Sequence, residues 1–105
     1  MLFDVRTVHR GGWEVVQVVG DVDLATMPTL QAALVSAGGE RVAVDLGGVD
    51  HFDPLGFGVV ISASLRTARR GARFAVLCAG RPRELFAESG VDQIVEVAAT
   101  MEDLA

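Results

Sequence analysis

Residues 42–61 read VAVDLGGVDHFDPLGFGVVI, and this segment decides the fold. Its first five residues form a short apolar run rich in β-branched side chains, which is typical of a strand covered on both faces. Gly47-Gly48 is predicted to end that strand. Asp53 can accept the free amide hydrogens of a helix that begins at Pro54, because proline suits the first helical position. The segment therefore predicts a central strand, a polar turn and a helix.

Strands and helices are predicted to alternate along the rest of the chain. Gly11-Gly12 suits a tight hairpin turn between the first two strands, which should pair antiparallel. Helices separate the remaining strands, and such alternation requires a mainly parallel sheet. We expect one α/β domain over residues 1–105, a mixed sheet with an N-terminal hairpin and packed helices. Its strands should span residues 3–7, 13–19, 42–46, 73–79 and 94–97, and its helices 25–37, 54–70 and 82–89.

Apolar residues at helical spacing predict which helix faces are buried. In the first helix the predicted buried stripe is Met27, Leu30, Leu34 and Ala37, and in the second it is Phe57, Ile61, Leu65 and Ala68. Arg66, Arg69 and Arg70 should then face water, at the helix end where positive charge suits the dipole.

Composition limits the class of protein. Half of the 105 residues are hydrophobic, enough for a core, while the net charge of −5 argues against a nucleic-acid binder. No apolar stretch reaches the roughly 18 residues of a membrane span, and no N-terminal run suits a signal peptide. We therefore expect a cytoplasmic protein without membrane insertion. The single cysteine, Cys78, lies in a predicted strand and should be a core thiol.

Enzyme chemistry finds little support in the sequence. Ser62 and Ser64 lie within a predicted helix, with no histidine close in sequence. The chain contains no lysine, which phosphate-binding loops and response-regulator receivers both need. A dinucleotide fingerprint would require glycine at Ile61, and His9 and His51 are too far apart in sequence to suggest a metal site. The sequence predicts no catalytic residue, cofactor or metal.

Five aspartates fall at or near the carboxyl ends of the two central strands. In a mainly parallel sheet these ends share one edge, so an acidic rim is expected there. The alternative is that each aspartate only caps a helix or fills a turn. The residues concerned are Asp21, Asp23, Asp45, Asp50 and Asp53.

The central segment resembles the STAS domains, above all the bacterial anti-sigma-factor antagonists. The resemblance rests on an apolar strand that ends in aspartate, an apolar-Asp pair, and the Gly-x-Gly of Gly56-Phe57-Gly58 at a helix start. The order of the other elements fits as well, so it covers essentially the whole chain. In that family the position after the one matching Asp53 is a serine that a partner kinase phosphorylates. Here it is Pro54, so the phosphorylation site is degenerate.

The resemblance implies a protein-binding function. In the family, the rim and the following helix dock an anti-sigma factor, typically a kinase of the histidine-kinase ATPase fold that also holds a sigma factor. The positions matching Asp23 and Asp53 are associated there with recognition by that kinase. Phe57, between two glycines, is expected to be exposed and Gly56 to point outward. The implied partner-binding residues are Asp21, Asp23, Asp53, Pro54, Leu55, Gly56, Phe57 and Gly58.

Two other functions stay open at this point. A STAS domain also serves as a scaffold subunit in a larger assembly, such as a transporter or a signalling complex. An enzyme would need a pocket of substrate size at the acidic rim.

Overall fold

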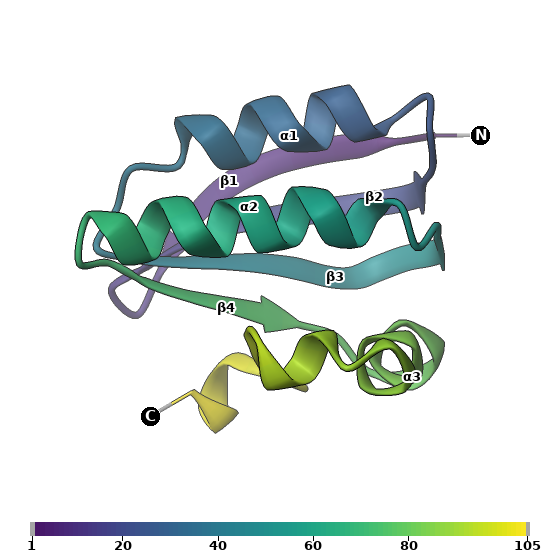
Figure 1. Cartoon of the computed structure of the whole chain (residues 1–105). Helices are drawn as coiled ribbons and strands as arrows, with labels where there is room; N and C mark the ends of the chain where they lie inside the picture. The colour runs from purple at the N-terminus through teal and green to yellow at the C-terminus, as the bar shows by residue number, and fades with distance from the viewer. Residues whose placement is uncertain (1, 105) are drawn as a thin grey trace.

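The computed structural model describes residues 2–104 and contains one mixed sheet with strand order β1-β2-β3-β4-β5 (Figure 1). β1 pairs with β2 antiparallel, and every other pairing is parallel, as expected. In chain order the elements are β1 (Asp4–Arg10), β2 (Trp13–Val22), α1 (Met27–Ser36), β3 (Arg41–Phe52), α2 (Gly56–Arg69), β4 (Arg73–Leu77), α3 (Gly80–Ser89), a 3-10 turn (Val91–Gln93), β5 (Glu96–Ala98) and a second 3-10 turn (Met101–Asp103).

The sheet buries side chains on both faces. The larger core lies between the sheet and the helices, where valines such as Val16 and Val44 pack with Leu30 of α1 and Val60 of α2. A second, smaller cluster consists of small and apolar residues of β2 to β5. Met101 and Leu104 of the C-terminal segment pack against it. Residues of the central strands therefore alternate between two apolar environments, which explains why β3 begins as an unbroken apolar run.

The predicted end of the central strand is wrong. β3 continues past Gly47-Gly48 to Phe52, which pairs with Val22 of the equally extended β2. The register shifts beside the two glycines, and a Cβ on Gly48 would lie 3.0 Å from Val19 Cγ2. Gly48 thus permits β2 and β3 to approach each other closely, and no turn forms at Gly47-Gly48. Asp50 and His51, expected in a polar turn, are strand residues.

The second helix differs from the expectation in its start and its buried face. α2 begins at Gly56, because Pro54 and Leu55 form a preceding turn. Its buried stripe is Gly56, Val60, Ala63 and Thr67, while Leu65 is 50% exposed. The Thr67 hydroxyl donates a 2.8 Å hydrogen bond to the carbonyl oxygen of Ser64, so burial leaves it satisfied. Because two of the four positions are glycine and threonine, a search for hydrophobic residues at helical spacing does not detect this stripe.

Arg66, expected to face water, is only partly exposed and its Nη2 is buried, whereas several other expectations are confirmed. Gly11 and Gly12 both have positive φ (56° and 82°) in the hairpin turn, and Cys78 is buried. The four stripe residues of α1 are buried as expected, and the remaining elements occur in place with ends displaced by a few residues. None of the helices within residues 2–104 combines the length and the apolar character needed to cross a membrane.

Candidate functional site

Two loops lie side by side at the carboxyl ends of β2 and β3. Val22 pairs with Phe52 at the ends of these strands, and the main-chain N–H of Asp53 donates a 2.8 Å hydrogen bond to the carbonyl oxygen of Val22. Figure 1 shows both loops at the same end of the sheet, where α1 and α2 begin. We call this surface the acidic edge and define it by Asp21, Asp23, Leu24, Asp50, Asp53, Pro54 and Leu55.

Asp23 organises the first loop. Its carboxylate accepts hydrogen bonds from the main-chain N–H groups of Ala25 and Thr26, each at 3.0 Å. In return the N–H of Asp23 donates to the hydroxyl oxygen of Thr26 at 2.9 Å, and that hydroxyl donates to the carbonyl oxygen of Asp21 at 2.7 Å. The loop is therefore held by reciprocal side-chain contacts before α1 begins.

Asp53 organises the second loop in a similar way. Its carboxylate accepts a 2.9 Å hydrogen bond from the N–H of Leu55, and its carbonyl oxygen accepts one of 2.8 Å from the N–H of Gly56. The sequence-based expectation that Asp53 caps the helix is therefore wrong: the N-cap residue of α2 is Leu55, no side chain caps it, and Asp53 instead holds the turn before the helix. Pro54 has no main-chain N–H, so it leaves no hydrogen-bond donor without a partner in this turn.

The two aspartate-held loops expose two leucines. Leu24 is 75% exposed and Leu55 is 63% exposed, although both residues adjoin well-ordered hydrogen bonds. The acidic edge therefore presents two large apolar side chains beside its carboxylates. Leu24 was missed by the sequence analysis, because an apolar residue between two predicted elements resembles the first turn of a helix.

The acidic rim is smaller than expected. Asp45 lies within β3, where its carboxylate accepts a 2.8 Å hydrogen bond from the N–H of Gly47. It lines a pocket with Leu77 and Met101, beside the smaller core. Asp45 therefore does not belong to the acidic edge, and the carboxylates there are those of Asp21, Asp23, Asp50 and Asp53.

The Gly-x-Gly motif at the start of α2 lies largely beneath the acidic edge. Phe57 is half-buried, and its ring lies 5.2 Å from that of Phe52 and 4.9 Å from that of Phe86, between ring centroids. Gly56 is buried, and a Cβ there would lie 2.8 Å from Phe52 Cζ. The expectations of an exposed Phe57 and an outward Gly56 are therefore wrong. Of the two glycines in the motif, only Gly58 faces open space.

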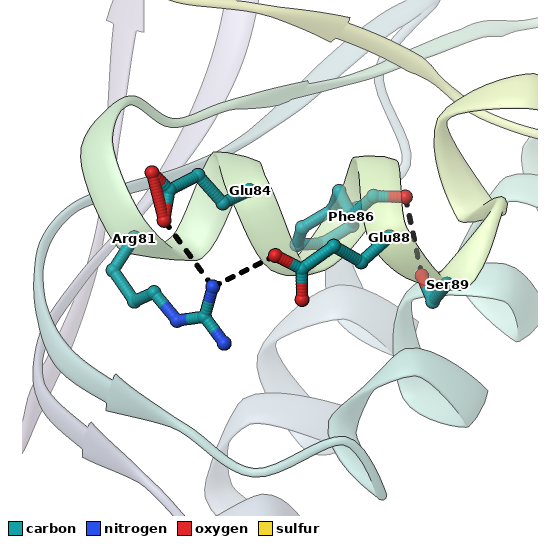
Figure 2. A network of polar contacts seen from close by, with 5 residues as sticks. All are labelled: Arg81, Glu84, Phe86, Glu88 and Ser89. Carbon is teal, nitrogen blue, oxygen red and sulfur yellow. Dashed lines mark hydrogen bonds and ion pairs between the residues drawn. The ribbon is translucent and has the colours of Figure 1, made fainter.

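A charged network on α3 borders this region. Arg81 donates hydrogen bonds to the carboxylates of Glu84 (3.2 Å) and Glu88 (2.9 Å), as Figure 2 shows. These bonds, that to Glu88 first, raise the pKa of Arg81. Arg81 also lines a pocket of about 200 Å³ with Asp50 and Pro54. Because Glu84 and Glu88 already balance its charge, Arg81 leaves the carboxylates of the acidic edge uncompensated.

The structure brings together some, but not all, of the residues singled out from the sequence. Within residues 2–104, the acidic and histidine side chains form no cluster of three or more that could hold a metal ion. Of the eight residues implied as partner-binding, Asp21, Asp23, Asp53, Pro54 and Leu55 lie together on this surface. Gly56 and Phe57 lie beneath it, and Gly58 follows on the exposed side of α2.

Comparison with known proteins identifies the fold. The family model described as Mlab, STAS domain matches residues 5–96. An anti-sigma factor antagonist from Mycobacterium paratuberculosis has a similar structure, with a TM-score of 0.87 at 22% sequence identity over 97% of this chain and 90% of that one. A putative anti-sigma factor antagonist from Thermotoga maritima gives 0.78 at 15% identity, over 96% and 89%.

A third similar structure is that of the Bacillus cell fate determinant SpoIIAA in its phosphorylated form, with a TM-score of 0.68 at 20% identity over 97% of this chain and 95% of that one. No curated protein sequence matches the chain significantly. The family model covers most of the sequence, and the structures agree with it in fold over nearly the whole length. The chain therefore belongs to the STAS domain family.

Proposed function

We propose that this protein is a binding module of the anti-sigma-factor antagonist type. It sequesters an anti-sigma factor and so regulates transcription that depends on a sigma factor. The partner is an anti-sigma factor or kinase of the histidine-kinase ATPase fold, and the protein itself performs no catalysis. Support comes from the membership in the STAS family and from solved structures of similar fold that are described as anti-sigma factor antagonists.

The acidic edge carries the proposal. Its two loops are joined by the hydrogen bond from Asp53 to Val22, and they present Leu24 and Leu55 among carboxylates. A partner that buries these leucines and supplies basic side chains would match this surface in both shape and charge. Because the loops are already held by Asp23 and Asp53, binding would order few groups and lose little conformational entropy.

Pro54 determines how such binding would be regulated. It is exposed in the second loop at the position where the family carries a phosphorylated serine, and proline has no hydroxyl. Phosphorylation at this position is chemically impossible. We therefore propose that partner binding is not switched at the usual site, and that the complex forms equally well with or without ATP hydrolysis.

Partner capture followed by calorimetry tests the proposal. The protein is immobilised, bound proteins from its own cell extract are identified, and the affinity of the captured partner is measured for Leu55→Asp and Leu24→Asp. Each variant should weaken binding by about tenfold or more, as expected for an apolar anchor at the centre of an interface. Ile94→Asp is the matched control, because Ile94 is an exposed apolar residue on another part of the surface.

Two outcomes would contradict the proposal. Unchanged affinity of both leucine variants, with Ile94→Asp weakened instead, would place the interface elsewhere. Capture of a transporter ATPase or of a STAS assembly, without any anti-sigma factor, would favour the scaffold function.

A further inference from the structure

Arginines gather at the end of the molecule opposite the acidic edge. There the carboxyl-terminal ends of α1 and α2 lie beside the amino-terminal ends of β3 and β4 (Figure 1). Five of the nine arginines in the chain line two adjoining pockets at this end: Arg41, Arg66, Arg69, Arg70 and Arg73. The molecule therefore carries opposite charge at its two ends.

One of these pockets is a groove between α1 and α2 with a volume of about 370 Å³. Its apolar part comes from Leu34, Val35 and Ala63, and three arginines complete it. We call it the arginine groove. It combines a surface for apolar side chains with donors that suit carboxylates.

The arginines of the groove have different roles. Arg70 Nη2 donates hydrogen bonds to the carbonyl oxygens of Ala37 (3.1 Å) and Gly39 (2.7 Å), in the segment that follows α1. Arg66 is different, since its Nη2 is buried and has no hydrogen-bond partner within residues 2–104. A buried nitrogen of a charged group without an acceptor is costly, so a rotation of the guanidinium that brings this nitrogen to an incoming carboxylate would be favoured. Arg69 is exposed beside it and can supply a second donor.

The matching surface is present on the same chain. The acidic edge offers four carboxylates and two exposed leucines, and the groove offers two available arginines and apolar walls. Since the two surfaces lie at opposite ends of one molecule, they can meet only between two copies.

We propose that the protein associates head to tail, with the acidic edge of one copy docked in the arginine groove of the next. Leucine side chains of the edge occupy the apolar part of the groove, and edge carboxylates accept hydrogen bonds from Arg66 and Arg69. Such a contact joins two different surfaces, so it repeats from copy to copy and builds assemblies larger than a dimer, which are open chains unless the rotation between copies closes a ring. The proposal does not depend on the identity of any other partner. It implies that self-association covers the surface assigned above to partner binding.

Sedimentation velocity across a series of protein concentrations at low ionic strength tests this directly. The weight-average sedimentation coefficient of the wild type should rise steadily with concentration, without a plateau at the dimer. Added salt should reverse the rise, because exposed charges are screened over about 10 Å at 0.1 M. Arg66→Glu and Arg69→Glu should each lower the association constant by about tenfold or more. Arg83→Glu makes the same charge change on α3, outside the groove, and should associate as the wild type does.

Mixing two variants distinguishes head-to-tail contact from any symmetric one. Arg69→Glu keeps an intact acidic edge, and Leu55→Asp keeps an intact groove. At a concentration where the wild type associates and each variant alone remains a monomer, an equimolar mixture of the two variants should form a dimer and stop there. Circular dichroism and melting temperature verify that the variants fold, and Arg69, being exposed, serves if Arg66→Glu is unstable.

The proposal is overturned if the wild type stays monomeric at all concentrations in low salt. It is also overturned if the arginine variants associate as the wild type does, or if the wild type associates and the mixture fails to form a dimer.

Discussion

Gly56 packs so closely against Phe52 that a Cβ at this position would lie 2.8 Å from Cζ and 3.2 Å from Cε2 of the ring. Phe52 is itself buried and packs against Phe57 and Phe86, so a shift of its ring would disturb the packing of all three aromatic side chains. Gly56 thus sets the distance between α2 and the end of β3, directly beneath the acidic edge.

The first prediction compares the two glycines of the motif. Gly56→Ala should lower the free energy of unfolding by about 1–3 kcal/mol, because the added methyl group overpacks the aromatic cluster. Gly58→Ala should raise it by roughly 0.5–1 kcal/mol, since a Cβ there meets nothing within 4 Å and alanine favours the helix. Urea denaturation of both variants measures the difference. Equal effects of the two substitutions would contradict the placement of Gly56.

The second prediction concerns the degenerate phosphorylation site. Pro54→Ser should fold, at a cost of roughly 0.4–1 kcal/mol that arises in the unfolded state. If the loop keeps a geometry that a cognate kinase recognises, the variant becomes a substrate. The added phosphate, with about −1.5 to −2 charges beside Asp50 and Asp53, should then weaken partner binding.

Mass spectrometry after incubation with the kinase and ATP checks this result. The wild-type segment from Asp53 to Gly58 should remain unmodified, because it contains no hydroxyl group. Phosphate elsewhere on the wild type would reveal a relocated switch, and an unmodified Pro54→Ser would mean that the kinase no longer recognises the loop.

The third prediction is a pH dependence caused by Cys78. Burial raises the pKa of its thiol from the ordinary 9.0 to about 11. In the unfolded chain the thiol ionises first, so the unfolded state gains stability as the pH rises. The free energy of unfolding should be independent of this group below pH 9, fall between pH 9 and 11 by up to about 1.4 kcal/mol per pH unit, and level off above that range.

The chain is well suited to this measurement, because it contains no lysine and no tyrosine that would titrate in the same interval. Denaturant titrations at several pH values should reveal the slope in the wild type and its loss in Cys78→Ala. A slope of the same size in Cys78→Ala would assign it to another group.

The fourth prediction separates two neighbouring arginines of α2. Arg70→Ala removes both hydrogen bonds to the carbonyl oxygens after α1 and should destabilise the fold by about 0.5–1.5 kcal/mol. Arg69→Ala should change stability by less than about 0.5 kcal/mol, since its exposed side chain makes neither of these bonds. Thermal melting of dilute protein tests both. A larger effect for Arg69→Ala than for Arg70→Ala would contradict the assigned roles.

The sequence predicted the order and the type of every strand and α-helix, because glycine turns and helical periodicity are local signals. It misplaced the end of β3, since Gly47-Gly48 is also a local signal for a turn, whereas the pairing with β2 depends on residues distant in sequence. The buried face of α2 was missed for a related reason. Gly56 is buried because its lack of a side chain lets it fit closely, and Thr67 is buried because its hydroxyl is hydrogen-bonded. A hydrophobicity pattern reflects neither property.

The candidate site was predictable in part. Asp23 and Asp53 could be placed at one edge because the strands that precede them are parallel neighbours. The exposure of Leu24, the inward position of Gly56 and the unpaired nitrogen of Arg66 depend on tertiary packing, and no spacing along the chain encodes them.

The hydrogen bond between Asp53 and Val22 also governs how the loops at this edge open. The bond belongs to both loop regions at once, so neither can separate from the sheet while it persists. The amide hydrogens of Ala25 and Thr26 in the first loop and of Asp53 and Leu55 in the second should therefore exchange with solvent deuterium in one cooperative event and not by independent fraying. In kinetic terms the two loops form a single unit of local unfolding, and a ligand that slows exchange in one loop would slow it equally in the other.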